Sequence, residues 1–190
     1  MIQCTGGGLK LGQSSDLEPS SSQFTCLGVA KAPWAASDER WAPENFVTVD
    51  GKYNYMFFSD RNDGKQRIGW ARSSSGPAKE AYTEYSPSYL NLGMAPGGDI
   101  DSNVFADSSN GKTYLVWKTD DNAVGSLTTR IWIQELSFAN ETFNQVGSPV
   151  VIMDSAGLWW VTSWLQGGSP RDGAGEWMVL FVLRCWSVLH

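Results

Sequence analysis

The fold of this chain is decided by residues 97–117, which read GGDIDSNVFADSSNGKTYLVW. Residues that favour strands, among them valine, phenylalanine, tyrosine and tryptophan, flank the middle of this stretch. Asn110-Gly111 lies between them and supplies the positive backbone dihedrals that a tight hairpin turn needs. The stretch therefore predicts a strand, a turn and a returning strand.

The first of these strands carries an unusual run of polar side chains. Side chains alternate along a strand, so two faces are predicted. One face carries Asp99, Asp101 and Asn103, and the other carries Ile100, Ser102 and Val104. Carboxylates are costly to bury, so the first face belongs in solvent or in a polar site. On the pattern alone, the aspartates fit a strand cap beside Gly97-Gly98 as well as they fit a functional site.

Composition favours an all-β protein and argues against several partners. The chain has 190 residues, with 20 glycines and 10 tryptophans, which is typical of a domain rich in strands and turns. A formal net charge of −6 argues against nucleic acid and against anionic membranes as partners. No run reaches the roughly 20 apolar residues of a membrane span. The three cysteines show no metal-ligand spacing, so we predict no metal and no other cofactor.

The stretch at 97–117 is the second of two similar units. In the first unit, Asp50-Gly51 separates strand-like runs at residues 45–49 and 53–58, and a polar loop is expected at 60–65. Third strands are expected at 66–71 and 131–134, and fourth strands at 89–92 and 149–153. Four strands in each unit are typical of β-propeller blades, although the period of about 60 residues is longer than the usual 40–50.

The returning strands of both hairpins are rich in large apolar side chains. Alternate positions on a central blade strand face the neighbouring sheet. We therefore expect burial between blades for Tyr55, Phe57, Leu115 and Trp117.

Several motifs, in this order, resemble those of a known family. They are Trp41-Ala42-Pro43-Glu44, Ile68-Gly69-Trp70-Ala71, Ile100-Asp101 followed by Val104-Phe105 and Asp107, residues 111–117, and Ile131-Trp132-Ile133. Over residues 32–165 the chain resembles the family 43 glycoside hydrolases. The resemblance implies a partial five-bladed β-propeller with about two complete blades plus fragments. Residues 1–31 would then be a poorly patterned remnant of blade one, and residues 166–190 a divergent apolar tail.

The resemblance also implies an activity, namely hydrolysis of arabinofuranosyl or xylosyl bonds in plant cell-wall polysaccharides with inversion. An inverting enzyme uses one carboxylate to activate water and one carboxylic acid to protonate the leaving oxygen. A third carboxylate in this family raises the pKa of the acid, and the matching residue is Asp101. Ser102 stands where family members usually have proline.

The other two catalytic positions match less well. No Asp-Pro dipeptide is present for the general base, and Asp16 is not assigned that role. Glu176, in Gly175-Glu176-Trp177, is the candidate general acid. We therefore expect the chain to be truncated at both ends and catalytically incomplete as given.

Substrate contacts are expected from Trp41, Glu44, Asp99 and Trp70, although tryptophans in a propeller more often pack between blades. The implied partner is arabinan, arabinoxylan or xylan, and neither nucleic acid nor a membrane is expected as a partner.

The resemblance implies an extracellular protein, although residues 1–12 contain no signal-peptide core. Asn140-Glu141-Thr142 is a candidate glycosylation acceptor. A non-catalytic carbohydrate-binding propeller remains the alternative function.

Overall fold

The computed structural model describes the central part of the chain and short segments before it. The described residues are 10–13, 25–28, 32–36, 40–48, 51–73, 82, 84–93, 96–125 and 129–154. Among these residues, no helix combines the length and the apolar character needed to cross a bilayer.

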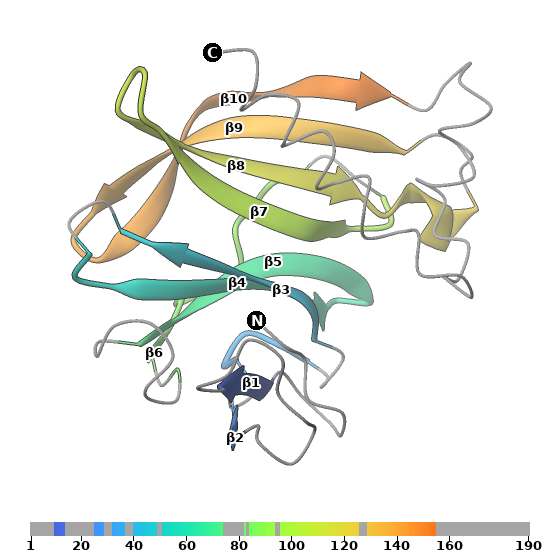
Figure 1. Ribbon diagram of the computed structural model, residues 1–190. Coiled ribbons are helices and arrows are strands. Elements are labelled where there is room, and N and C mark those ends of the chain that lie inside the picture. Colours follow the sequence, from blue (N-terminus) through green and yellow to red (C-terminus); the bar gives the residue numbers. More distant parts are fainter. Residues whose placement is uncertain are drawn as a thin grey trace.

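Two four-stranded antiparallel sheets make up most of this part, so the predicted all-β class is confirmed. The first sheet has the order β3 (Trp41–Val47), β4 (Asn54–Asn62), β5 (Lys65–Ser73) and β6 (Glu84–Tyr85). The second has β7 (Asp99–Asp107), β8 (Lys112–Thr119), β9 (Arg130–Ala139) and β10 (Thr142–Asp154), with the short 3-10 helix η2 (Asp121–Val124) after β8. Figure 1 shows β7 lying against the first sheet, where it contacts β3, β4 and β5.

The segment before the first sheet has more structure than its sequence predicts. β1 (Lys10–Gln13) and β2 (Thr25–Gly28) pair antiparallel within the region that we expected to be patternless. Strands of this length are too short to show a clear alternation of apolar and polar side chains. The pairing therefore left no signal in the sequence.

The hairpin between β4 and β5 is tighter than predicted. We expected a polar loop at residues 60–65, but the two strands continue until Asn62 pairs with Lys65. Asp63 and Gly64 form the turn with φ angles of 51° and 75°. Two consecutive positive φ angles define the primed turn that matches the twist of the flanking strands. The polar residues at this end of the sheet therefore lie on strands.

The fourth strand of the first sheet also differs from the prediction. Residues 89–92 form no strand, and β6 lies earlier at Glu84–Tyr85. The chain nevertheless follows β5, because Ser86 N donates to Trp70 O at 2.9 Å and Leu90 N donates to Ile68 O at 2.7 Å. The apolar residues at 90 and 92 gave the strand-like pattern because both are buried in the core.

A β-bulge interrupts β7 at Asp101. Ile100 pairs with Lys118, but the next paired residue on β7 is Asn103, opposite Val116. One extra residue is therefore inserted in β7, and Asp101 adopts the left-handed φ of 55°.

The bulge makes the predicted two-face division of β7 wrong. Asp99 pairs with Thr119 and Val104 pairs with Leu115. Those two partners lie four residues apart on β8, so they share one face. Asp99 therefore shares a face with Val104, on the side where Trp117 lies, whereas Asn103 lies on the side of Ile100. Strict alternation fails wherever a bulge shifts the register by one residue.

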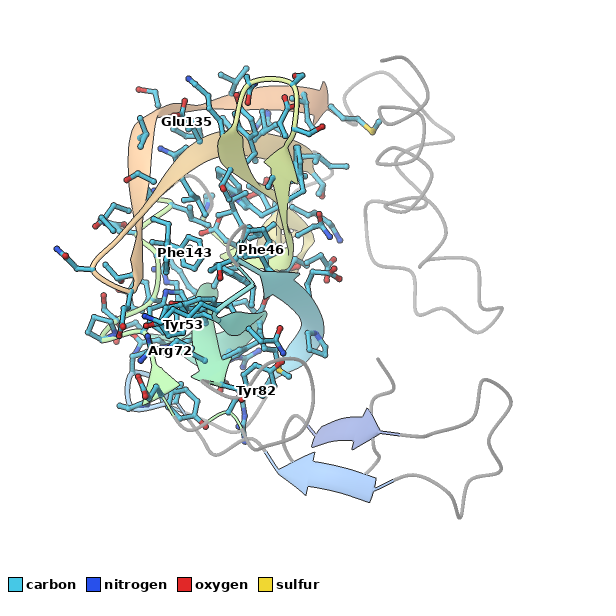
Figure 2. The ribbon with its side chains drawn as sticks, turned by 60° about the vertical axis from the view of Figure 1, so that its left-hand side comes forward. Phe46, Tyr53, Arg72, Tyr82, Glu135 and Phe143 are labelled. Atoms are coloured by element: carbon cyan, nitrogen blue, oxygen red, sulfur yellow. The ribbon has the colours of Figure 1, made fainter. Side chains whose placement is uncertain are left out.

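An aromatic cluster fills the space between the two sheets. Tyr55, Phe57, Leu115 and Trp117 are each 0% exposed, which confirms their predicted burial. Phe143 on β10 lies at the centre of the cluster (Figure 2). Its ring contacts the rings of Phe46, Tyr55, Phe57, Trp70 and Phe138, with centroid separations of 4.9 to 6.4 Å.

Arg72 on β5 fastens the β9–β10 turn to the first sheet. Its guanidinium donates to Glu141 Oε2 at 2.6 Å, pairs with Glu84, and lies 4.6 Å from the centroid of the Tyr53 ring. Figure 2 shows Arg72 beside Tyr53. Tyr55 Oη donates to the Glu141 carbonyl at 3.0 Å. Hydrogen bonds from Tyr53 and Arg72 also hold the pKa of Glu141 below its ordinary value. These contacts hold Glu141 in its left-handed conformation, with φ of 61°.

The outer edge of the second sheet is β10, and its second half is apolar and exposed. The exposed residues are Val146, Val150, Val151 and Ile152, with Val150 the most exposed at 60%. The pairing with β9 is interrupted between Val146 and Val150 and again between Val151 and Met153. These interruptions bend the strand away from a regular ladder.

Replacing Phe143 by Ala should lower the free energy of unfolding by roughly 3–5 kcal/mol, because the ring is central to the buried cluster. Val150→Ala, at an exposed position on the same strand, should change it by less than about 0.5 kcal/mol. Urea denaturation followed by tryptophan fluorescence measures both. A loss below about 1 kcal/mol for Phe143→Ala would contradict a core shared by the two sheets.

Candidate functional site

Gly97 and Gly98 bring the start of β7 into close backbone contact with β5 of the first sheet and with the end of β8. Gly98 forms a parallel bridge with Gln66 of β5, and its carbonyl accepts a hydrogen bond from Asp120 N at 2.8 Å. A Cβ atom added to Gly97 would lie 1.8 Å from the Asp120 carbonyl oxygen, and one added to Gly98 would lie 2.5 Å from the Gln66 carbonyl oxygen. Only glycine permits these approaches, which place the residues that follow against both sheets.

Asp99 is the first carboxylate after this contact, and it is 1% exposed. Trp117 Nε1 donates to Asp99 Oδ1 at 3.0 Å, and Arg67 Nη1 of the first sheet lies 4.0 Å from Oδ2. Burial raises the pKa of the Asp99 carboxyl to about 6, although Trp117 and Arg67 both act in the opposite direction. Asp99 is therefore a buried carboxyl that interacts with residues of both sheets and changes its charge near pH 6.

Asp101 lies two residues further on, in the bulge, and is only half-buried. Burial raises the pKa of the Asp101 carboxyl, the positive charge of Lys118 opposes this rise, and the negative charge of Asp120 adds to it. Asp101 is therefore partly accessible, whereas Asp99 is enclosed, which is a correction of the substrate contact expected of Asp99.

These carboxylates belong to a larger group of charges that we call the charged cluster. It consists of Asp99, Asp101, Asp120 and Asp121 together with Arg61, Lys65, Arg67 and Lys118. The residues come from the β4–β5 hairpin, the start of β7 and the end of β8, which the Gly98 contact brings to one end of the two sheets. Burial raises the pKa of Asp120 as well. Carboxyl groups with raised pKa values beside cations can hydrogen-bond hydroxyl groups and take part in proton transfer.

The other predicted site residues are placed differently. Glu44 on β3 is half-buried, and burial raises the pKa of its carboxyl. Trp70 is 5% exposed, and its ring contacts Tyr55 and Phe143. It therefore has no open face for a sugar, and the alternative of packing between sheets accounts for it. This is a correction of its expected substrate contact.

Two predicted positions fall wholly or partly outside the described residues. Trp41 is placed by its backbone alone, which pairs with Ser59 on β4. Glu176 lies outside the described residues altogether, as does Asp16, to which no role was assigned. The roles expected of Trp41 and Glu176 remain predictions.

The basic members of the charged cluster are not among the residues predicted from the sequence. Arg67 and Lys118 lie within strands whose neighbouring positions are buried, and each stands beside a large apolar residue, Ile68 and Trp117 respectively. A charged residue inside such a strand is uncommon unless it has a partner. This pattern could have marked both residues as candidates for a polar site.

The family model for glycosyl hydrolases family 43 matches residues 3–178 of this chain. The chain belongs to this family. The match confirms the resemblance predicted from the motifs, including the segment that contains Ile100-Asp101. No curated protein matches the chain in a sequence comparison.

Several solved structures align with this chain, and the first of them shows a similar fold. An endo-arabinase from Bacteroides thetaiotaomicron VPI-5482 aligns with a TM-score of 0.57 and 20% identity, over 80% of this chain and 49% of that one. An α-L-arabinanase from Cellvibrio cellulosa aligns with a TM-score of 0.49 and 22% identity, over 76% of this chain and 50% of that one. An endo-1,4-β-xylanase from Bacteroides thetaiotaomicron VPI-5482 aligns with a TM-score of 0.46 and 20% identity, over 75% and 45%. This chain spans about half the length of these structures.

Replacing Gly98 by Ala should lower the free energy of unfolding by roughly 3 kcal/mol or more, because the residue has a φ of 115° and its new Cβ would meet the backbone of Gln66. Gly111→Ala is the matched control, since its φ of 71° is also positive but the surrounding space is open. That control should cost only about 1–2 kcal/mol. Equal costs in urea denaturation would contradict the proposed importance of the Gly98 contact.

Asp99→Asn should change how stability depends on pH. The folded-state pKa of Asp99, about 6, exceeds its ordinary value of 3.8, so the folded protein binds more protons between these values. Wild-type stability should therefore fall as pH rises from about 4 to about 6, by up to roughly 3 kcal/mol from this group. Asp99→Asn should lack that decrease.

The measurement is urea denaturation at several pH values between 4 and 7. Asp63→Asn, in the exposed β4–β5 turn, serves as the control substitution. Parallel curves for wild type and Asp99→Asn would show that the buried carboxyl does not carry this pH dependence.

Proposed function

We propose that this chain carries part of the site of a glycoside hydrolase that cleaves arabinose- or xylose-containing polysaccharides with inversion. The observation that carries the proposal is the position of Asp101, which lies in the family's Ile-Asp motif and is presented by a bulge beside Lys118 and Asp120. Membership of family 43 supports the reaction class. Structural neighbours named as arabinanases and a xylanase agree with the substrate class.

In this proposal Asp101 tunes the acid and does not itself attack the sugar. A negative charge near a carboxylic acid raises the pKa of that acid, which keeps it protonated for transfer to the leaving oxygen. Lys118 favours the charged form of Asp101 against the cost of its burial. Asp99 holds the start of the strand through Trp117 and Arg67, and Glu44 on β3 is available to accept hydrogen bonds from sugar hydroxyls. Glu176 is the proposed acid.

The proposed fold is a five-bladed β-propeller in which the two four-stranded sheets are successive blades. Each sheet is an antiparallel meander, and the first strands of the two sheets, β3 and β7, contact one another. The propeller part would span residues 32–165. An extracellular location is proposed with it, because polysaccharides of plant cell walls are too large to enter a cell.

Titration of the purified chain with arabino- and xylo-oligosaccharides tests the assignment of Asp101 to a sugar site. We expect binding, seen by NMR as shifts of the amides near Asp101, and a loss of affinity of about tenfold in Asp101→Asn, because a charge-assisted hydrogen bond is weakened. Asp63→Asn is the matched control, since Asp63 is exposed and has nearly the same left-handed φ, 51° against 55°. Equal affinities in the two variants would contradict the assignment.

A parallel assay with aryl α-L-arabinofuranoside and aryl β-xyloside tests the reaction. We expect turnover below about 1 s⁻¹, because general acid and base help is worth about 10²–10⁴-fold each and neither role is assigned among the described residues. Faster hydrolysis that Asp101→Asn abolishes would show that the catalytic set is complete. Retention at the anomeric carbon, read by NMR of the released sugar, would contradict inversion.

A further inference from the structure

The β9–β10 turn presents the Asn140-Glu141-Thr142 tripeptide at the surface. Asn140 and Glu141 form the two-residue turn, with φ angles of 51° and 61°, and Ala139 pairs with Thr142 across it. Asn140 is exposed, whereas Glu141 is held by Arg72 and Tyr55. It is the chain's only match to the pattern Asn-x-Ser/Thr.

Phe138 lies two residues before Asn140 and is unusually exposed for a phenylalanine, at 37%. Its ring contacts the rings of Tyr55 and Phe143, at centroid separations of 5.6 and 4.9 Å, so it is fixed in place by the core. Asn140 lies in the turn, two residues further along the chain, and a chain spans at most about 7 Å over two residues. That distance is within reach of the first sugar of a glycan attached to the asparagine.

We propose that Asn140 is an N-glycosylation site whose first sugar packs on the exposed part of the Phe138 ring. The donor is an oligosaccharide linked to a lipid diphosphate. A bond forms between Asn140 Nδ2 and the anomeric carbon of the sugar, the bond from that carbon to the diphosphate breaks, and the proton lost from Nδ2 leaves with the lipid diphosphate. The apolar C–H face of the pyranose ring then covers apolar surface that water otherwise contacts.

The contacts of Glu141 do not obstruct the modification. Arg72 and Tyr55 hold Glu141 to the first sheet only after folding. Transfer to a nascent chain precedes folding, and the folded turn leaves Asn140 at the surface. The same contacts then keep the glycosylated turn in one conformation beside Phe138.

Secretion of the full chain from a eukaryotic host tests the modification. We expect a mass increase at Asn140 that a peptide N-glycosidase removes, and no increase in Asn140→Gln or Thr142→Ala. Thr142→Ser retains the acceptor pattern and should remain modified. An unmodified wild-type chain, or a modification that survives Asn140→Gln, would overturn the proposal.

Comparison with the same sequence made in a bacterial cytosol, which lacks the glycan, tests the packing. The glycosylated form, also after trimming to a single sugar, should melt about 2–4 °C higher, the shift expected from one aromatic contact in a domain of this size. Phe138→Leu keeps an apolar side chain against Tyr55 and Phe143 but has no ring, so the glycan should no longer raise its melting temperature. An equal rise in wild type and Phe138→Leu would overturn the contact with Phe138.

Discussion

The close contact of Gly97 and Gly98 with Asp120 and Gln66 determines how the two sheets meet. It joins the start of β7 to the end of β8 within one sheet and to β5 of the other. No side chain larger than hydrogen fits at either glycine while the backbone keeps this arrangement. The polar end of the molecule therefore depends on backbone contact, whereas the opposite, aromatic region depends on the packing of large rings such as Phe143.

Two aspartates separated by one residue acquire different properties from this arrangement. Asp99 follows the glycine contact directly and is enclosed by Trp117 and Arg67. Asp101 falls in the bulge, where it adopts a left-handed φ and the positive charge of Lys118 favours its charged form. A single inserted residue thus separates a fully buried carboxyl from a partly accessible one. Family 43 membership supports the role proposed for the partly accessible one, Asp101.

The strands and the buried aromatic rows could be predicted because their signals are local. Gly51 and Gly111 adopt the positive φ angles expected of them, 69° and 71°, although the loop at residues 108–111 is longer than the predicted tight turn and Asn110 has no positive φ. Apolar alternation marks Tyr55 and Trp117 as core. The charged cluster could not be predicted, because its members come from separate hairpins and only long-range contacts unite them. The bulge at Asp101 was missed for a related reason: an inserted residue depends on the pairing with β8, which alternation along one strand does not reveal. The two-residue turn at Asp63-Gly64 was not predicted, because the polar residues on either side of it are typical of a longer loop.

The interrupted pairing of β10 has a consequence for how this protein behaves among copies of itself. An exposed edge strand rich in valine and isoleucine is a template on which another chain can add a strand. Here the template is broken, because the residues between Val146 and Val150 leave the ladder and Pro149 offers no N–H group. Gln134 of the neighbouring strand also donates to the Gly147 carbonyl at 2.7 Å and so occupies an acceptor in the gap. The irregularity of β10 therefore hinders other copies of the chain from adding a strand along this sheet edge.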